Sequence, residues 1–167
     1  FAVLLPGKKI PSYTLIYWDG DGNQMEHYDP YAYPMQFTEQ EQKQFENGIC
    51  YSIYEKLGAH PVKIDGVSGV YFAVWAPNAI RVSVVGNFNN WDGRAYQMNL
   101  LESGIYELFI PGVRAGDIYK YEIKAKGGLT YLKSDPYANA AQLRPNNASV
   151  VVDLGKYAWQ DENWMKK

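Results

Sequence analysis

The 167-residue sequence contains a single cysteine, Cys50, and only two histidines, His27 and His60. One cysteine cannot close an internal disulfide, which favours a reducing, cytoplasmic environment over a secreted one. The three side chains have none of the spacings of a tetrahedral zinc site. A chain of this length buries about 70% of the surface that its unfolded form exposes, so its fold requires no cross-link. We therefore expect no cofactor and no metal.

The sequence also lacks an excess of charge of either sign and has no long apolar run. The 16 lysines and arginines nearly balance the 18 acidic residues and are interspersed with them, so there is no basic face for a nucleic-acid partner. No apolar run approaches the roughly 20 residues of a membrane span, and the first ten residues lack the order of a signal peptide. Because the sequence begins with Phe1 rather than methionine, we expect a part of a longer chain.

The sequence also lacks a catalytic constellation. No turn of the G-x-S-x-G type presents a nucleophile, and no acidic residue stands in the recognisable setting of a glycosidase carboxylate pair. The segment Asp19–Asn23 starts like a calcium loop, but Gln24 and Pro30 occupy the places where an EF-hand needs glycine and a bidentate carboxylate. We interpret it as a hairpin turn and expect no catalysis by this chain.

Short apolar runs with period-2 alternation, separated by Gly, Asn, Asp and Pro clusters, fill the sequence from Gly69 onward. They predict seven strands, at residues 70–75, 81–86, 96–101, 105–110, 118–125, 129–133 and 149–153. Seven short antiparallel strands at this spacing are typical of an all-β, immunoglobulin-like sandwich. Upstream, residues 13–18 and 24–28 predict a hairpin, and the capping box of Thr38 and Glu41 predicts one short surface helix over residues 39–47.

An internal repeat organises the chain. Residues 1–13 run parallel to residues 106–119, and Asp29-Pro-Tyr-Ala32 falls on Asp135-Pro-Tyr-Ala138 after the hairpin. We interpret this as a duplication, so that the chain begins halfway through a first sandwich. The expected divisions are the C-terminal half of a first β-module at 1–35, a helical connector at 36–53, a complete sandwich module at 54–155 and a linker at 156–167.

The sharpest aromatic cluster is Gly86-Asn-Phe-Asn-Asn-Trp-Asp-Gly93, where a polar loop follows a strand. The apolar faces of pyranose rings stack on flat aromatic surfaces, and their hydroxyls need short planar hydrogen-bonding side chains. Trp91 with Asn90 therefore predicts a sugar contact, with the alternative that Trp91 fills one end of the core. Lys120 lies between two tyrosines on a strand and faces away from them, towards solvent or towards sugar hydroxyls. Trp75, between Val74 and Ala76, is expected in the core.

The segments Tyr54-Glu-Lys-Leu-Gly-Ala-His-Pro61, Gly69–Val82 and Gly86–Arg94 resemble the amino-terminal region of 1,4-alpha-glucan (glycogen) branching enzymes. The resemblance implies a carbohydrate-binding module of family 48, preceded by part of a related module. It also implies that a catalytic (β/α)8 barrel of the alpha-amylase superfamily follows. Such a parent cleaves an alpha-1,4 link of a glucan and re-attaches the freed chain through an alpha-1,6 link. This stretch, which lacks the catalytic acids, would contact or guide glycogen or maltooligosaccharide and dock on the barrel.

The ligand residues of glycogen-sensing kinase subunits, which share these motifs, carry over by resemblance to Trp91, Lys120, Leu143 and Asn147. Their second stacking tryptophan falls on Leu132, which puts a strong free-standing glycogen site in doubt. The alternative of another class is a free-standing glycogen-targeting or regulatory module. A debranching parent is disfavoured by the Leu-Gly-Ala-His element alone.

Overall fold

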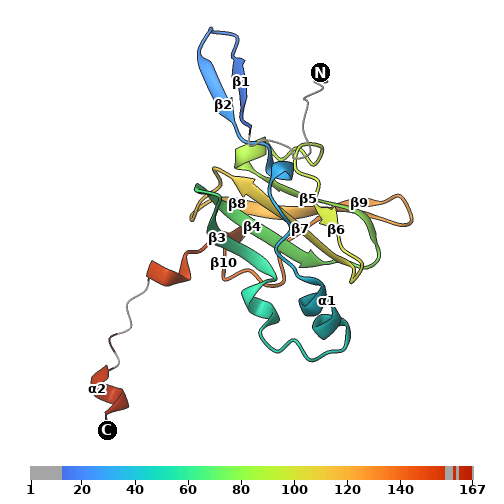
Figure 1. Cartoon of the computed structure of the whole chain (residues 1–167), viewed down its shortest axis with the longest axis vertical. Helices are drawn as coiled ribbons and strands as arrows, with labels where there is room; N and C mark the ends of the chain where they lie inside the picture. Colours follow the sequence, from blue (N-terminus) through green and yellow to red (C-terminus); the bar gives the residue numbers. More distant parts are fainter. Residues whose placement is uncertain (1–12, 157–159, 161, 167) are drawn as a thin grey trace.

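The computed structural model describes residues 13–156, 160 and 162–166, and two antiparallel sheets packed face to face form its body (Figure 1). The predicted all-β, immunoglobulin-like sandwich is confirmed. One sheet has the order β3-β4-β7-β6, with strands at Gly58–Ile64, Val67–Trp75, Ile105–Pro111 and Asn99–Leu100. The other has the order β10-β11-β8-β5, with β9 also paired to β8; its strands are Ala140–Ala141, Ser149–Val150, Ile118–Ala125, Ala79–Gly86 and Thr130–Lys133.

The main core lies between the two sheets, where alternate residues of β4, β5, β7 and β8 meet. Phe72 of β4 packs edge-on against Tyr119 of β8, with ring centroids 5.0 Å apart. Tyr119 and Tyr121 are fully buried, and both hydroxyls donate to the buried carboxylate of Asp135, at 2.6 and 3.1 Å. These bonds satisfy polar groups that would otherwise be costly to bury.

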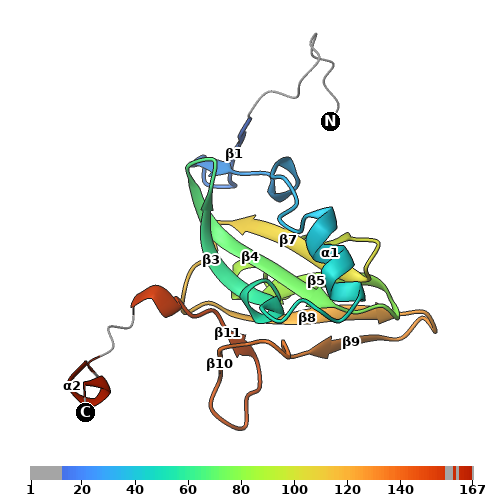
Figure 2. The ribbon, with the colours of Figure 1, turned by 60° about the horizontal axis from the view of Figure 1, so that its bottom comes forward.

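A second, smaller core covers the outer face of the β3-β4-β7-β6 sheet. The connector before β3 lies over this face and includes α1, Glu39–Glu46, and two short 3₁₀ turns, Pro30–Ala32 and Ile53–Glu55 (Figure 2). The buried carboxylate of Glu107 fastens it, accepting the backbone N–H groups of Gln36 at 3.0 Å and Phe37 at 3.1 Å and the hydroxyl of Tyr71 at 2.5 Å. The predicted capping box is present, because Thr38 and the side chain of Glu41 cap each other reciprocally.

The hairpin of β1, Leu15–Trp18, and β2, Gln24–His27, projects from one end of the sandwich (Figure 1). Its register is that of the β8–β9 hairpin moved by 106 residues: Leu15 pairs with His27 as Tyr121 pairs with Lys133. The turns agree too, since the amide of Gly22 donates to Asp19 and that of Gly128 to Ala125.

The corner that follows each hairpin is also the same. The Asp29 carboxylate accepts the amide of Tyr31 at 2.9 Å and the hydroxyl of Tyr13. The Asp135 carboxylate accepts the amide of Tyr137 at 2.8 Å and the hydroxyl of Tyr119. The repeat read from the sequence therefore extends to hydrogen bonds. The beginning of the repeat, residues 1–12, lies outside the described residues.

Several expectations need correction. The strand expected at 149–153 ends at Val150, and the sequence did not predict β10. The sequence did not predict β3, because this edge strand contains Pro61 and leaves its middle residues exposed, so it lacks the apolar alternation of a half-buried strand. The strand expected at 96–101 is reduced to Asn99–Leu100 and an isolated bridge between Gln97 and Ser83. Trp75 does not belong to the core: it ends β4 and is 53% exposed.

The C-terminal part of the description holds a 3₁₀ turn at Leu154–Lys156 and the short helix α2 at Glu162–Met165, which lie away from the sandwich (Figure 2). No helix within the described residues is long and apolar enough to cross a membrane.

Candidate functional site

The candidate site begins in the loop that follows β5 at Gly86, where residues Asn87–Asn89 form a 3₁₀ turn. The side chain of Asn89 holds this loop closed. Its Oδ1 accepts the Gly86 amide at 2.9 Å, and its amide group donates to the carbonyls of Val84 at 3.0 Å and Asp92 at 3.2 Å. The Trp91 amide donates to the Gly86 carbonyl at 2.9 Å. The loop is therefore tied to the strand end by bonds that its own sequence supplies.

Trp91 is half-buried, and its indole Nε1–H donates to Asn87 Oδ1 at 2.9 Å. Asn90 and Trp91 both have left-handed backbones, with φ of 52° and 60°. This conformation is uncommon for a bulky side chain and costs of the order of 1–3 kcal/mol per residue, and strain of this kind clusters at ligand clamps and active sites. The loop thus holds its tryptophan at an energetic cost.

The end of the core beside this loop is filled by other aromatics. Phe88 and Tyr96 pack against the main core cluster, with ring centroids 6.0 Å apart, and Phe88 lies 6.5 Å from Phe72. Trp91 does not take part in this packing. Because Phe88 and Tyr96 already fill this end of the core, the alternative that Trp91 fills it is disfavoured.

The loop lies on the outer face of the β5–β8 ribbon. A Cβ added to Gly93 would overlap the carboxylate of Glu122 on β8, and that carboxylate is ion-paired with Arg81 on β5. Beyond this contact, the Arg94 guanidinium holds the pKa of the exposed Asp92 carboxyl at about 2, well below its usual range. A side chain at position 93 would therefore have to displace the end of the Glu122 side chain from its ion pair with Arg81.

Lys120 lies on this same outer face of β8, since its neighbours Tyr119 and Tyr121 point into the core. Its Nζ donates to Asn147 Oδ1, and the backbone carbonyl of Asn147 accepts the hydroxyl of Ser134. The structure thus brings together two of the five residues predicted for the site, from segments 27 residues apart.

The other predicted residues are exposed. Asn90 is exposed in the loop, and Leu143, 90% exposed, stands in the turn between β10 and β11. No hydrogen bond between the described side chains links either of them to Trp91 or Lys120. Leu132 pairs with Glu122 across β8–β9 and so shares its face.

Sequence reasoning missed Asn87 and Asn89 as the residues that position Trp91. The sequence does show three asparagines before the tryptophan in this loop. It does not show which of them bond to the loop backbone or to the indole.

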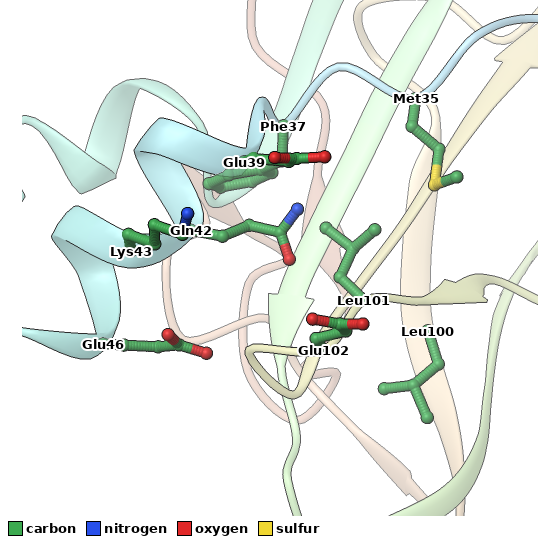
Figure 3. A pocket seen from close by; sticks show the side chains of 9 residues that line it. All are labelled: Met35, Phe37, Glu39, Gln42, Lys43, Glu46, Leu100, Leu101 and Glu102. Atoms are coloured by element: carbon green, nitrogen blue, oxygen red, sulfur yellow. The ribbon is translucent and has the colours of Figure 1, made fainter.

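Other regions of the surface are hollowed. A groove of about 550 Å³ runs between α1 and the turn after β6, lined by the residues shown in Figure 3.

In residues 13–156 and the described C-terminal positions, no group of three or more His, Cys, Asp or Glu side chains could hold a metal ion.

Comparison with known proteins gives three findings. Residues 56–138 match the family Carbohydrate-binding module 48 (Isoamylase N-terminal domain). The chain is 49% identical over 171 residues to the 1,4-alpha-glucan branching enzyme GlgB of Synechococcus sp. (strain JA-3-3Ab), covering 97% of this chain and 22% of that protein. It is 48% identical over 163 residues to the GlgB of Cellvibrio japonicus (strain Ueda107), covering 96% of this chain and 22% of the relative.

Among solved structures, Klebsiella pneumoniae pullulanase complexed with maltotriose superimposes with a TM-score of 0.51 and 27% identity, over 66% of this chain and 11% of that chain. The chain spans about 22% of the length of the curated relatives that it matches.

Proposed function

Residues 56–138 belong to the carbohydrate-binding module 48 family, and the chain is homologous to the N-terminal region of 1,4-alpha-glucan branching enzymes; from this we propose that it is the glucan-contacting, non-catalytic front part of such an enzyme. The parent would cleave an alpha-1,4 link and re-form it as an alpha-1,6 branch on a barrel that follows this stretch. Identity near 49% with branching enzymes, against 27% with a pullulanase, supports branching over debranching.

The observation that carries the proposal is the fastened Trp91 in the loop after β5; the neighbouring strand β8 carries Lys120, whose ammonium is bonded to Asn147. The indole face would stack on a pyranose ring of glycogen, alpha-1,4-glucan or maltooligosaccharide. A lysine ammonium has three donors, and the bond to Asn147 uses one of them, which leaves donors for sugar hydroxyls. Asn90 would supply a further hydrogen bond, and the exposed Leu143 an apolar contact at the rim.

The two buried carboxylates of the module support a non-catalytic role for it. Glu107 and Asp135 are 1% and 6% exposed, and their hydrogen bonds go to backbone amides and tyrosine hydroxyls of the fold. Neither is free to act on a substrate. Incubating the fragment with amylose should leave the iodine spectrum unchanged, and a shift in that spectrum would contradict this assignment.

We also propose the domain division given by the repeat. Leu15 and Tyr17 occupy the places of Tyr121 and Ile123 on the core side of a hairpin, yet they are 49% and 50% exposed. In the parent these side chains would be covered by the remainder of a first sandwich. Towards the other end, the exposed Leu154, Trp164 and Met165 would pack on the barrel.

The sugar site is tested by affinity electrophoresis in gels containing glycogen. Trp91→Ala should abolish the retardation of the fragment, whereas Trp91→Phe, which keeps an aromatic face, should retain part of it. Trp164→Ala is the matched control, because Trp164 is 75% exposed on α2, which lies away from the sandwich (Figure 2), and its loss should change nothing. A wild-type fragment that shows no retardation would refute the proposal.

A further inference from the structure

A second exposed tryptophan, Trp75, stands at the opposite end of the sandwich from Trp91. It ends β4, whereas Trp91 follows the far end of β5, and the length of β5 separates these ends by roughly 23 Å at about 3.3 Å per residue. Trp75 also projects from the other sheet, on the side that the connector covers only in part. It is therefore independent of the site described above.

Two neighbours lie against the Trp75 indole, Phe45 and Gly104. Phe45 of α1 meets it edge-on, with ring centroids 5.9 Å apart and an angle of 72°. A Cβ on Gly104 would lie 3.4 Å from its Nε1 and 3.1 Å from Pro77. Gly104 has a φ of +77°, where other residues are strained. The glycine at this position thus leaves the indole edge uncovered, and Trp75 is 53% exposed.

Two shallow grooves flank the turn that ends at Gly104. The first, of about 550 Å³, lies between α1 and this turn, with Leu101 and Phe37 as apolar floor (Figure 3). The second, of about 450 Å³, shares Leu100, Leu101 and Glu102 with the first and is also lined by Pro77, Ser103 and Gly104. Trp75 adjoins the grooves through two neighbours, Gly104 and Phe45 of α1.

The rim of the first groove is rich in planar hydrogen-bonding groups. The Gln42 side chain extends from α1 towards Leu101, and the carboxylates of Glu46 and Glu102 stand on the two walls (Figure 3). None of the ion pairs in the described part of the chain uses either carboxylate. Carboxylates accept strong bonds from hydroxyl donors and repel phosphate. Glu39 and Lys43 line the same groove, so three glutamates face one lysine, and this net negative charge disfavours an anionic ligand and leaves acceptors for a neutral polyhydroxylated one.

We propose that Trp75 and the grooves beside it form a second alpha-glucan contact, in which a pyranose ring stacks on the indole and the adjoining residues of the glucan hydrogen-bond to Gln42 and Glu102. The inference rests on the proposed function for the substrate class. Two contacts at opposite ends of one module would engage different chains of a branched glycogen particle, which raises the avidity without strengthening either contact.

The test measures maltoheptaose binding from the indole ¹H–¹⁵N signals of the fragment, with Trp75 assigned by Trp75→Phe. Both the Trp75 and the Trp91 signals should shift, with separate binding curves. The double variant Gln42→Ala/Glu102→Ala should abolish the shift at Trp75, leave that at Trp91, and weaken glycogen binding at least about fivefold. The matched control Gln40→Ala lies on α1 outside the groove and should bind like the wild type.

The outcomes separate this inference from the proposed function. A Trp75 signal that stays fixed while the Trp91 signal saturates would overturn the second contact and leave the first, and the face would then belong to a protein partner. A protein in which neither signal moves would refute both. Unchanged dispersion of the remaining amide signals shows that the double variant is folded, so that its loss of binding counts.

Discussion

Replacing Glu107 by alanine should release the connector from the sandwich. The Glu107 carboxylate accepts the amides of Gln36 and Phe37 and the hydroxyl of Tyr71, and it is 1% exposed. Each buried donor left without a partner costs about 1–3 kcal/mol. Water entering the new cavity would satisfy some of them, so we expect a loss of about 3–5 kcal/mol in the free energy of unfolding. That is a large share of the 5–15 kcal/mol typical of a whole protein.

The assay is urea unfolding combined with amide hydrogen exchange. A loss of this size corresponds to a fall in Tm of about 10 °C for a domain of this length, and the Gln36 and Phe37 amides should lose their protection first. Glu102→Ala is the matched control, an exposed glutamate on the nearby turn whose removal should change the free energy by less than about 0.5 kcal/mol. Wild-type stability in Glu107→Ala, or full protection of the two amides, would refute the reasoning.

The same carboxyl group predicts a pH dependence. Burial raises the pKa of Glu107, and the hydrogen bonds from Tyr71 and the two amides counteract this. Because the pKa is higher in the folded than in the unfolded protein, the folded protein binds more protons between the two values. The contribution of Glu107 to stability is therefore full below the unfolded value of about 4.3 and is lost as the pH rises through the folded value. Glu107→Gln should remove this dependence of the free energy of unfolding on pH. A variant that keeps the wild-type pH dependence would show that another group causes it.

Two further substitutions address the Trp91 loop. Gly93→Ala should destabilise the protein by no more than about 1 kcal/mol, because the new Cβ would push the flexible end of Glu122 away from Arg81; Gly20→Ala, where a Cβ meets nothing within 4 Å, is the control in the same urea assay. Asn87→Ala should weaken glycogen retardation while changing the free energy of unfolding by no more than about 1 kcal/mol, since it frees the Trp91 indole at an exposed position. Equal stability of the two glycine variants, or undiminished retardation of Asn87→Ala, would contradict these expectations.

Local sequence signals predicted most elements because the physics behind them is local. The capping box at Thr38 and the glycine-containing turns identified α1 and two hairpins, and period-2 alternation identified the strands that bury one face. The edge strand β3 was not predicted, because its middle residues are exposed on both faces and include Pro61, so they show no alternation of apolar and polar residues. The same holds for the candidate site: the residue types within one loop were enough to single out Trp91 as a candidate.

The sequence by itself predicted the sandwich and the aromatic loop, since the alternation of each strand and the composition of the loop are local in the chain, and it showed the repeat as matched residues 106 positions apart. Only the tertiary structure decided how far each tryptophan is exposed. Trp75 ends β4 and Trp91 follows β5, and their exposure depends on residues elsewhere in the chain: Phe88 and Tyr96 fill the core end beside the Trp91 loop, while α1 reaches Trp75 through Phe45. Likewise, Lys120 and Asn147 are bonded because the fold brings their two segments together, and their spacing in the sequence does not predict this contact.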